Sequence, residues 1–136
     1  MNPAAKPSQA DILVGPAISA SGGHASLLDR QTARAASMFL EKISTRFGPV
    51  EAILFGSRAR GTFHSESDAD IAVIVKGPHG TRSGVAMDMA GIAFDIMLET
   101  GILVDPLPLW EDEIRHPELF GNPALIGSIL REGVRL

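Results

Sequence analysis

Apolar residues recur at helical spacing in the first third of this chain. Because of this spacing, we expect a helix from Ser26 to Phe47, with Ser26 as its N-cap. Asp29, three residues further on, would complete a variant of the capping box. Gly48-Pro49 should end the helix. The apolar positions on which this prediction rests are Ala36, Leu40, Ile43 and Phe47.

Two further helices are expected in the second half of the chain. The range 81–100 has an apolar stripe at helical spacing, and Gly101 suits the C′ position that ends such a helix. The range 123–132 begins with proline after the capping residue Asn122 and ends at Gly133. The stripe of the longer helix consists of Val85, Met89, Ile92 and Ile96.

Three short apolar runs are typical of strands. They span 50–55, 68–75 and 102–110. Pro106 and Pro108 place the third run at a sheet edge, because proline has no backbone N–H to donate to a neighbouring strand. The resulting order of elements predicts an α/β (α+β) domain, with a small mixed β-sheet and helices on one face.

Composition narrows the choice of protein class. The 136 residues fit one domain, which we place at 26–136, after a flexible arm at 1–25 that is rich in Pro, Ala, Ser and Gly. A net charge of −4 argues against an extended groove for nucleic acid. The chain has no cysteine, which fits a cytoplasmic protein, and no apolar run approaches the roughly 20 residues of a membrane span.

Two aspartates stand at the mouth of the second predicted strand. Asp68 and Asp70 are two positions apart, so their side chains should point to one face, about 7 Å from each other. Such a pair repels unless a cation relieves it. Mg²⁺ is usually held by one or two carboxylates together with substrate phosphates, so the pair indicates a metal site.

The turn after the first predicted strand offers a place for phosphate. Gly56 permits a tight turn, and Ser57 with the following amides could bind an anion. Arg58 and Arg60 add cationic donors nearby. Gly-Ser or Asp-x-Asp alone is most often an ordinary turn. Together, with strands on both sides, they favour a site for a metal-bound nucleoside triphosphate.

The stretch "LFGSRARG…SDADIAVIV" resembles the signature of the polymerase-beta-like nucleotidyltransferase superfamily, and in particular its stand-alone minimal nucleotidyltransferase domains. The likeness is strongest over 52–75 and does not extend to 1–25. It implies that fold and transfer of a nucleoside monophosphate from a triphosphate, with ATP as the expected donor and Mg²⁺ as cofactor. By position, Gly56 and Ser57 would hold the triphosphate, and Asp68 and Asp70 would bind the metals.

The family also uses a third carboxylate on a later strand. Asp105, in the third predicted strand, stands where the family places this acid, and we take it as the third catalytic and metal-binding residue. Asp95 is the alternative. On the predicted helix it shares a polar stripe with Asp88 and Glu99, which is typical of a solvated face.

The resemblance further implies a protein partner. Stand-alone domains of this kind resemble the antitoxin half of toxin–antitoxin systems, whose partner is a helical HEPN-domain RNase. The expected acceptor is then a tyrosine of that partner. Two alternatives stay open: a catalytically inactive nucleotide-binding partner protein, and a nucleotidyltransferase that acts on a small molecule.

Overall fold

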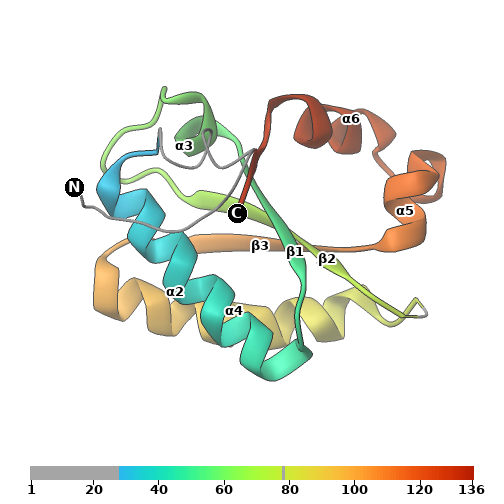
Figure 1. Cartoon of the computed structure of the whole chain (residues 1–136), viewed down its shortest axis with the longest axis horizontal. Coiled ribbons are helices and arrows are strands. Elements are labelled where there is room, and N and C mark those ends of the chain that lie inside the picture. The colour runs from blue at the N-terminus through green and yellow to red at the C-terminus, as the bar shows by residue number, and fades with distance from the viewer. Residues whose placement is uncertain (1–27, 78) are drawn as a thin grey trace.

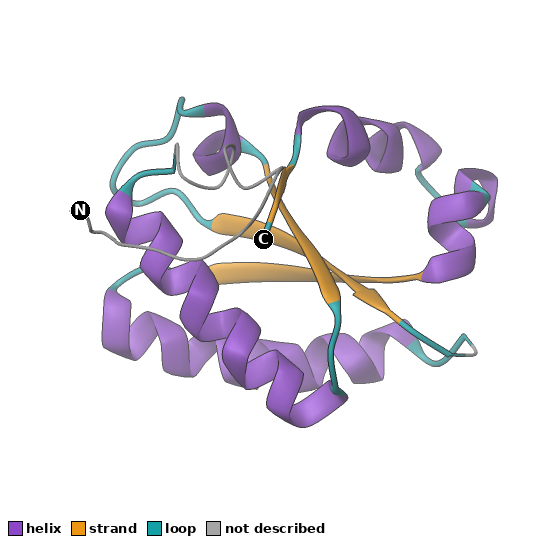
Figure 2. Ribbon diagram, in the orientation of Figure 1, coloured by secondary structure: helices purple, strands orange, loops and turns teal. Residues whose placement is uncertain are grey.

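A four-stranded mixed sheet forms the centre of the protein (Figures 1 and 2). The computed structural model describes residues 28–77 and 79–136, so the predicted arm at 1–25 lies outside the described residues. The strands are β1 (Glu51–Phe55), β2 (Ala69–Val75), β3 (Val104–Trp110) and β4 (Val134–Arg135), in the order β3-β2-β1-β4. β1 runs antiparallel to β2 and β4, whereas β2 and β3 are parallel. This arrangement confirms the predicted mixed sheet, with the proline-containing strand at its edge.

The first described helix, α2 (Arg30–Phe47), begins later than the sequence predicted. Asp29 is its N-cap rather than an internal residue, because its carboxylate accepts the backbone N–H of Thr32 at 3.1 Å. The predicted N-cap, Ser26, lies outside the described residues. The predicted end is confirmed, since Gly48 takes a φ of 82° that favours glycine.

The parallel strands β2 and β3 are joined by α4 (Arg82–Thr100), which starts after Thr81 and ends at Gly101 as predicted. A parallel pair requires such a crossover. α2 and α4 lie side by side on one face of the sheet (Figure 1). The most deeply buried side chains between these layers are Phe39, Ile43, Leu54, Ile71, Met89 and Ile96.

The other face of the sheet carries the last part of the chain, so the helices cover both faces and not one face as predicted. α5 (Glu111–Arg115), a short 3₁₀ turn η1 (Pro117–Leu119) and α6 (Pro123–Glu132) follow β3. From α6, Ile126 and Ile129 pack against strand residues such as Ile53, forming a second, smaller core. The sequence did not predict β4, because two residues are too few for a periodic pattern.

No helix in the described ranges is long and apolar enough to cross a membrane. The mixed sheet, its parallel β2–α4–β3 unit and the antiparallel β1 together position the candidate site, which lies where β2 and β3 begin.

Candidate active site

Strand register brings two of the predicted acids together. Asp70 in β2 pairs with Asp105 in β3, and on its other side Asp70 pairs with Phe55 in β1. Paired residues point to the same face of a sheet, so the two carboxylates are neighbours. Asp68 precedes β2 by one residue. Asp68 and Asp105 are exposed and Asp70 is half-buried, so all three side chains can be reached from solvent.

The electrostatics of Asp70 reflect this crowding of like charges. Partial burial raises the pKa of the Asp70 carboxyl above its ordinary value, the negative charges of Asp105 and then Asp68 raise it further, and Arg60 lowers it. Both neighbouring carboxylates are therefore near enough to disfavour ionisation of Asp70. A carboxylate that the fold leaves without full compensation is typical of a functional site.

Gly56 is required at this site for two independent reasons. Its φ of 77° and ψ of −159° lie in a region that only glycine adopts readily. A Cβ atom at this position would also stand 2.3 Å from Oδ2 of Asp70, well inside contact distance. The Asp70 carboxylate thus lies directly against the turn after β1, in space that any other residue at position 56 would fill.

A short helix, α3 (Ser57–Arg60), follows that turn. The first amides of a helix have no partner inside it, so the N–H groups of Ser57 and Arg58 are available to an acceptor. Gly56 itself closes the turn by accepting the amides of Ala59 and Arg60, each at 3.1 Å. Arg60 is exposed, and its effect on the pKa of Asp70 places its charge beside the carboxylates.

Arg58 does not stand where a phosphate ligand should. Only 3% of the residue is exposed, and its guanidinium is engaged inside the protein. It donates to the Ser67 carbonyl at 2.9 Å and to the Thr32 hydroxyl at 2.8 Å, and it lies over the Phe63 ring at 4.6 Å. The predicted role of the Arg58 side chain in nucleotide binding is therefore wrong.

Arg58 instead fixes the segment that presents Asp68. Arg58 has two carbonyl acceptors, Ser67 and, at 3.3 Å, Ser65, and both belong to the loop just before β2. On the other side, Thr32 connects it to the N-cap of α2 through Asp29. A sequence pattern cannot reveal the contact between Arg58 and Thr32, because the two residues are 26 positions apart.

Asp95, the alternative third acid, is remote from this group. It is exposed on α4 and lines a surface hollow between α2 and α4 with residues such as Met38 and Lys42. α4 covers the sheet face opposite the one that carries Asp70 and Asp105. Of the two candidates, only Asp105 is placed beside the aspartate pair.

The donor set fits a hard divalent cation that arrives with its own ligands. Within the described residues, no three His, Asp or Glu side chains are already arranged to hold a metal ion. Mg²⁺, however, commonly takes one or two carboxylates and completes its shell with water and substrate phosphate. Asp70 and Asp105, with Asp68 adjacent, supply that partial set. Burial and then the like charges of Asp105 and Asp68 raise the pKa of Asp70, and a cation bound there would offset those like charges.

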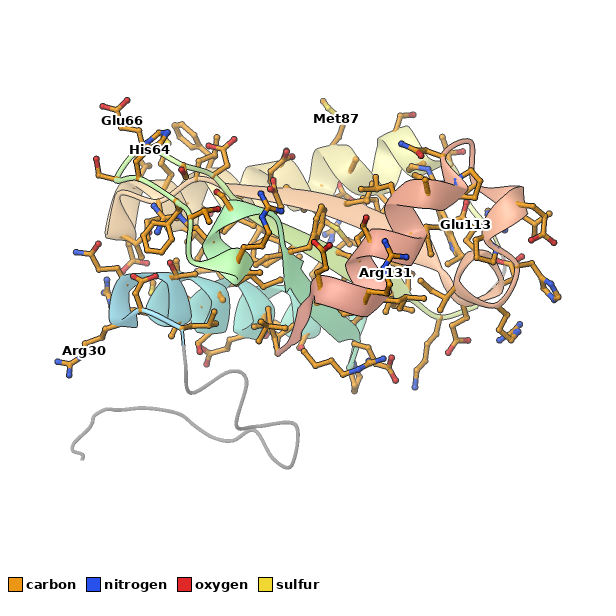
Figure 3. The ribbon with its side chains drawn as sticks, turned by 90° about the horizontal axis from the view of Figure 1, so that it is seen from above. Arg30, His64, Glu66, Met87, Glu113 and Arg131 are labelled. Carbon is orange, nitrogen blue, oxygen red and sulfur yellow. The ribbon has the colours of Figure 1, made fainter. Side chains whose placement is uncertain are left out.

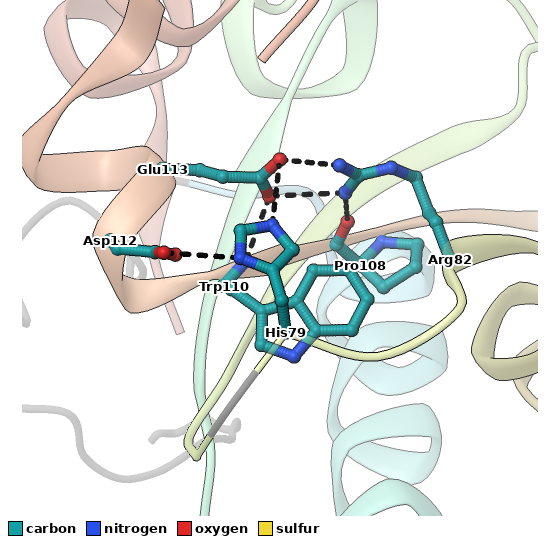
Figure 4. A network of polar contacts seen from close by, with 6 residues as sticks. All are labelled: His79, Arg82, Pro108, Trp110, Asp112 and Glu113. Atoms are coloured by element: carbon teal, nitrogen blue, oxygen red, sulfur yellow. Dashed lines mark hydrogen bonds and ion pairs between the residues drawn. The ribbon is translucent and has the colours of Figure 1, made fainter. Parts of the chain in front are cut away.

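A second polar cluster, which the sequence did not reveal, lies at the far end of β3 (Figure 4). Glu113 is 1% exposed and accepts hydrogen bonds from the Arg82 guanidinium and, at 3.0 Å, from the backbone N–H of Trp110. Arg82 also donates to the carbonyl of Pro108. His79 stacks on the Trp110 ring with centroids 4.7 Å apart. These contacts tie the start of α4 to β3 and α5.

Two comparisons relate this chain to known proteins. A family model described as a nucleotidyltransferase domain matches residues 36–135, a range that contains Gly56, Ser57 and all three aspartates. A crystal structure from Sulfolobus solfataricus, provisionally described as a nucleotidyltransferase, is 25% identical over 71% of this chain and 79% of that chain, with a TM-score of 0.42. No curated protein matches the chain.

Proposed function

This chain belongs to the nucleotidyltransferase domain family, as a minimal domain of that kind, and from this premise we propose that it transfers AMP from Mg²⁺-bound ATP to a hydroxyl group. One observation carries the proposal: strand pairing sets Asp105 beside Asp70, whose carboxylate lies directly against the turn at Gly56. Oxygen ligands of this kind suit Mg²⁺.

The aspartates, the first amides of α3 and Arg60 have different tasks in the proposed reaction. Asp70, Asp105 and Asp68 hold the metal ions, which would neutralise charge on the phosphates of the bound nucleotide. The amides at the start of α3, with Ser57, hold the triphosphate, and Arg60 contributes a positive charge from the exposed side.

The transfer itself is an in-line displacement. The acceptor oxygen forms a bond to the α-phosphorus, the bond from that phosphorus to the leaving oxygen breaks, and pyrophosphate departs with its electron pair. The acceptor hydroxyl must lose its proton in this step. Asp105 is the exposed carboxylate on the edge strand, so we assign it the acceptance of that proton.

For the acceptor, we propose a tyrosine hydroxyl on a HEPN-type toxin, which gives this chain the role of antitoxin. Asp105 stands on an edge strand, so a hydroxyl carried by a macromolecule can approach it from the side. The net charge of −4 makes a polyanionic RNA acceptor less favourable.

The test is transfer to the product of the neighbouring gene. The chain is incubated with that product, Mg²⁺ and ATP, and the intact mass of the product is measured. We expect an added AMP, located on a tyrosine by peptide mass spectrometry, with Asp105→Asn abolishing it. Asp95→Asn, an exposed aspartate outside the site, is the matched control and should act like the parent. An unmodified product, with label appearing on a small molecule instead, would contradict the protein acceptor.

A second candidate is nucleotide binding without transfer. It is favoured by the finding that no three acids in the described ranges are already set as metal ligands. Isothermal titration with a non-hydrolysable ATP analogue measures binding, and a separate incubation with Mg²⁺, ATP and candidate acceptors measures release of pyrophosphate. Binding of Mg²⁺–nucleotide together with no turnover on any acceptor supports the binder, whereas release of pyrophosphate supports the enzyme.

A further inference from the structure

α4 is apolar on two opposite sides. Its inner side, with Met89, Ala93 and Ile96, is fully buried against the sheet and α2. Its outer side exposes Met87 by 74%, Phe94 by 52% and Leu98 by 68%. Figure 3 shows Met87 projecting from α4 away from the rest of the chain. When a helix is apolar on two opposite sides, another element or molecule normally covers the second side.

These three side chains form one continuous line with a gap in it. Positions 87, 91, 94 and 98 follow each other at spacings of four, three and four, so they lie along a single stripe. We call this set the α4 stripe: Met87, Gly91, Phe94 and Leu98. Gly91 leaves a hollow between Met87 and Phe94.

Nothing in residues 28–77 and 79–136 requires a glycine at position 91. Glycine in the interior of a helix costs about 1 kcal/mol relative to alanine. Among the described residues, no heavy atom outside the backbone of its own helix lies within 4 Å of a Cβ built at position 91, so nothing there demands a small residue. A glycine in such a place is explained by the close approach of another molecule.

We propose that the α4 stripe is a dimer interface, covered by the same stripe of a second copy running antiparallel. The spacing of four, three and four reads the same in both directions. A two-fold axis near the middle of α4 therefore sets Met87 of one copy against Leu98 of the other. The same axis sets each Phe94 into the hollow above the opposite Gly91. A large ring over a missing side chain is the complementarity that a self-paired surface needs.

The position of the stripe favours a second copy over the acceptor of the transfer reaction. α4 covers one face of the sheet, and Asp70 and Asp105 lie on the other. A molecule bound to the stripe therefore lies on the other side of the sheet from those carboxylates. Pairing of two copies through α4 leaves both sites facing outward and open.

The acidic residues beside the α4 stripe predict how dimerisation depends on salt. Asp88, Asp95 and Glu99 are exposed along one flank of α4, and the antiparallel pair brings the two flanks to the same side. Asp88 is paired with Arg46 at 3.0 Å within each chain. The remaining repulsion is screened by salt, so dimerisation should strengthen as ionic strength rises. A partner helix with a basic flank would show the opposite dependence.

The first experiment is sedimentation equilibrium of the full chain over a range of concentrations and salt. We expect the mass to rise from the 14.4 kDa of one chain toward twice that value, more readily at high salt. Phe94→Asp should weaken association by at least about tenfold, because it sets a charge in the centre of the contact. Leu119→Asp changes an equally exposed residue outside the stripe, in η1, and should have no effect. A single-chain mass at every concentration would overturn the proposal.

Two glycine variants separate the interface from helix stability. Gly91→Gln and Gly84→Gln both replace an exposed glycine of α4 by a good helix former, and both should raise the melting temperature of the monomer. Gly91→Gln alone fills the hollow and should weaken association by about tenfold. If the two variants associate equally well, the hollow is not the contact point.

The chain has no cysteine, so single introduced thiols report on geometry directly. A mixture of Met87→Cys and Leu98→Cys chains, oxidised mildly, should give a disulfide-linked pair between the two variants. Each variant alone should give little. Preferential 87–87 or 98–98 cross-links would indicate a parallel pair and contradict the antiparallel arrangement.

Discussion

The two ends of β3 hold acids in opposite situations. At the start of the strand, Asp105 lies beside Asp70, where burial and the like charges of Asp105 and Asp68 raise the pKa of Asp70. Just beyond its end, Glu113 is more deeply buried, and desolvation alone would raise its pKa. Hydrogen bonds from Arg82, the Trp110 backbone and His79 outweigh that effect, so the pKa of Glu113 is lowered.

The charge of Glu113 is stabilised in the folded protein, whereas the charge of Asp70 is only partly compensated there. The Glu113 charge is matched by partners from within the chain, so it contributes to stability. The Asp70 charge has its match only in part, from Arg60. The missing compensation is what a metal-bound nucleotide would supply. Four substitution experiments can test this contrast, in order of the effect expected.

Asp70→Asn should have the largest effect on activity and a small, opposite effect on stability. Loss of the carboxylate that we propose as a metal ligand should lower the transfer rate by on the order of 10³-fold. A raised pKa means that the folded state disfavours the ionised form, so the neutral amide should raise the melting temperature by a few °C at pH 7. Transfer assays and thermal melts check both. A lowered melting temperature with retained activity would reverse the contrast.

Arg82→Met should affect stability first. It removes the main partner of Glu113 and leaves a buried carboxylate undercompensated, so we expect unfolding to become easier by about 3 kcal/mol. Arg46→Met breaks the exposed pair with Asp88 and should cost less than about 0.5 kcal/mol. Denaturant titration gives both values. Equal losses of unfolding free energy in the two variants would show that burial does not decide how much each ion pair contributes to stability.

Arg58→Lys should lower stability and activity together. Lysine keeps the charge and loses the fork that holds Ser67 and Thr32, so we expect a cost of about 1–2 kcal/mol. Because the loop before Asp68 is then less well fixed, kcat should fall by about tenfold while KM changes little. Arg34→Lys, on the exposed side of α2, is the control. A change confined to KM would restore Arg58 as a phosphate ligand.

Glu113→Gln should have the smallest effect, and it should depend on pH. A carboxyl with a lowered pKa in the folded state contributes stability above its ordinary value of 4.5, and the contribution is lost as pH falls through the lowered value. The free energy of unfolding of the parent should therefore fall more steeply below about pH 4.5 than that of the variant. Glu118→Gln, which is exposed, should follow the parent. Identical acid profiles for the parent and Glu113→Gln would contradict the assignment.

Much of the fold could be predicted because its determinants are local. Glycine ended α2 and α4 at the predicted residues, and proline marked β3 as an edge strand. Strand alternation set Asp68 and Asp70 on one face, and the family resemblance pointed to Asp105, which β3 pairs with Asp70. The start of α2 was wrong because two capping residues lay within one turn, and the carboxylate of Asp29 bonds to the Thr32 amide.

The errors and omissions come from contacts between distant segments. Arg58 looked like a phosphate ligand beside Gly56-Ser57, but its partner Thr32 is on another helix. The bond from Arg82 to Glu113 joins residues 31 positions apart. In α4, the stripe through Met89 and Ile96 was found, but a periodic pattern cannot show that Phe94 on the other side stays exposed. No spacing rule reports such tertiary facts.

Because Asp70 and Asp105 are paired across two strands, the site depends on whether an insertion shifts the strand register by an odd or an even number of residues. Val104 faces the main core and Asp105 the opposite side, since successive strand residues alternate. A single residue inserted between Gly101 and Val104 that shifts the register of β3 by one would bring Val104 opposite Asp70. The side chain of Asp105 would then point to the other face of the sheet. An insertion in the turn between β2 and α4 leaves this pairing intact. Heritable length variation should therefore be tolerated before α4 and purged after it.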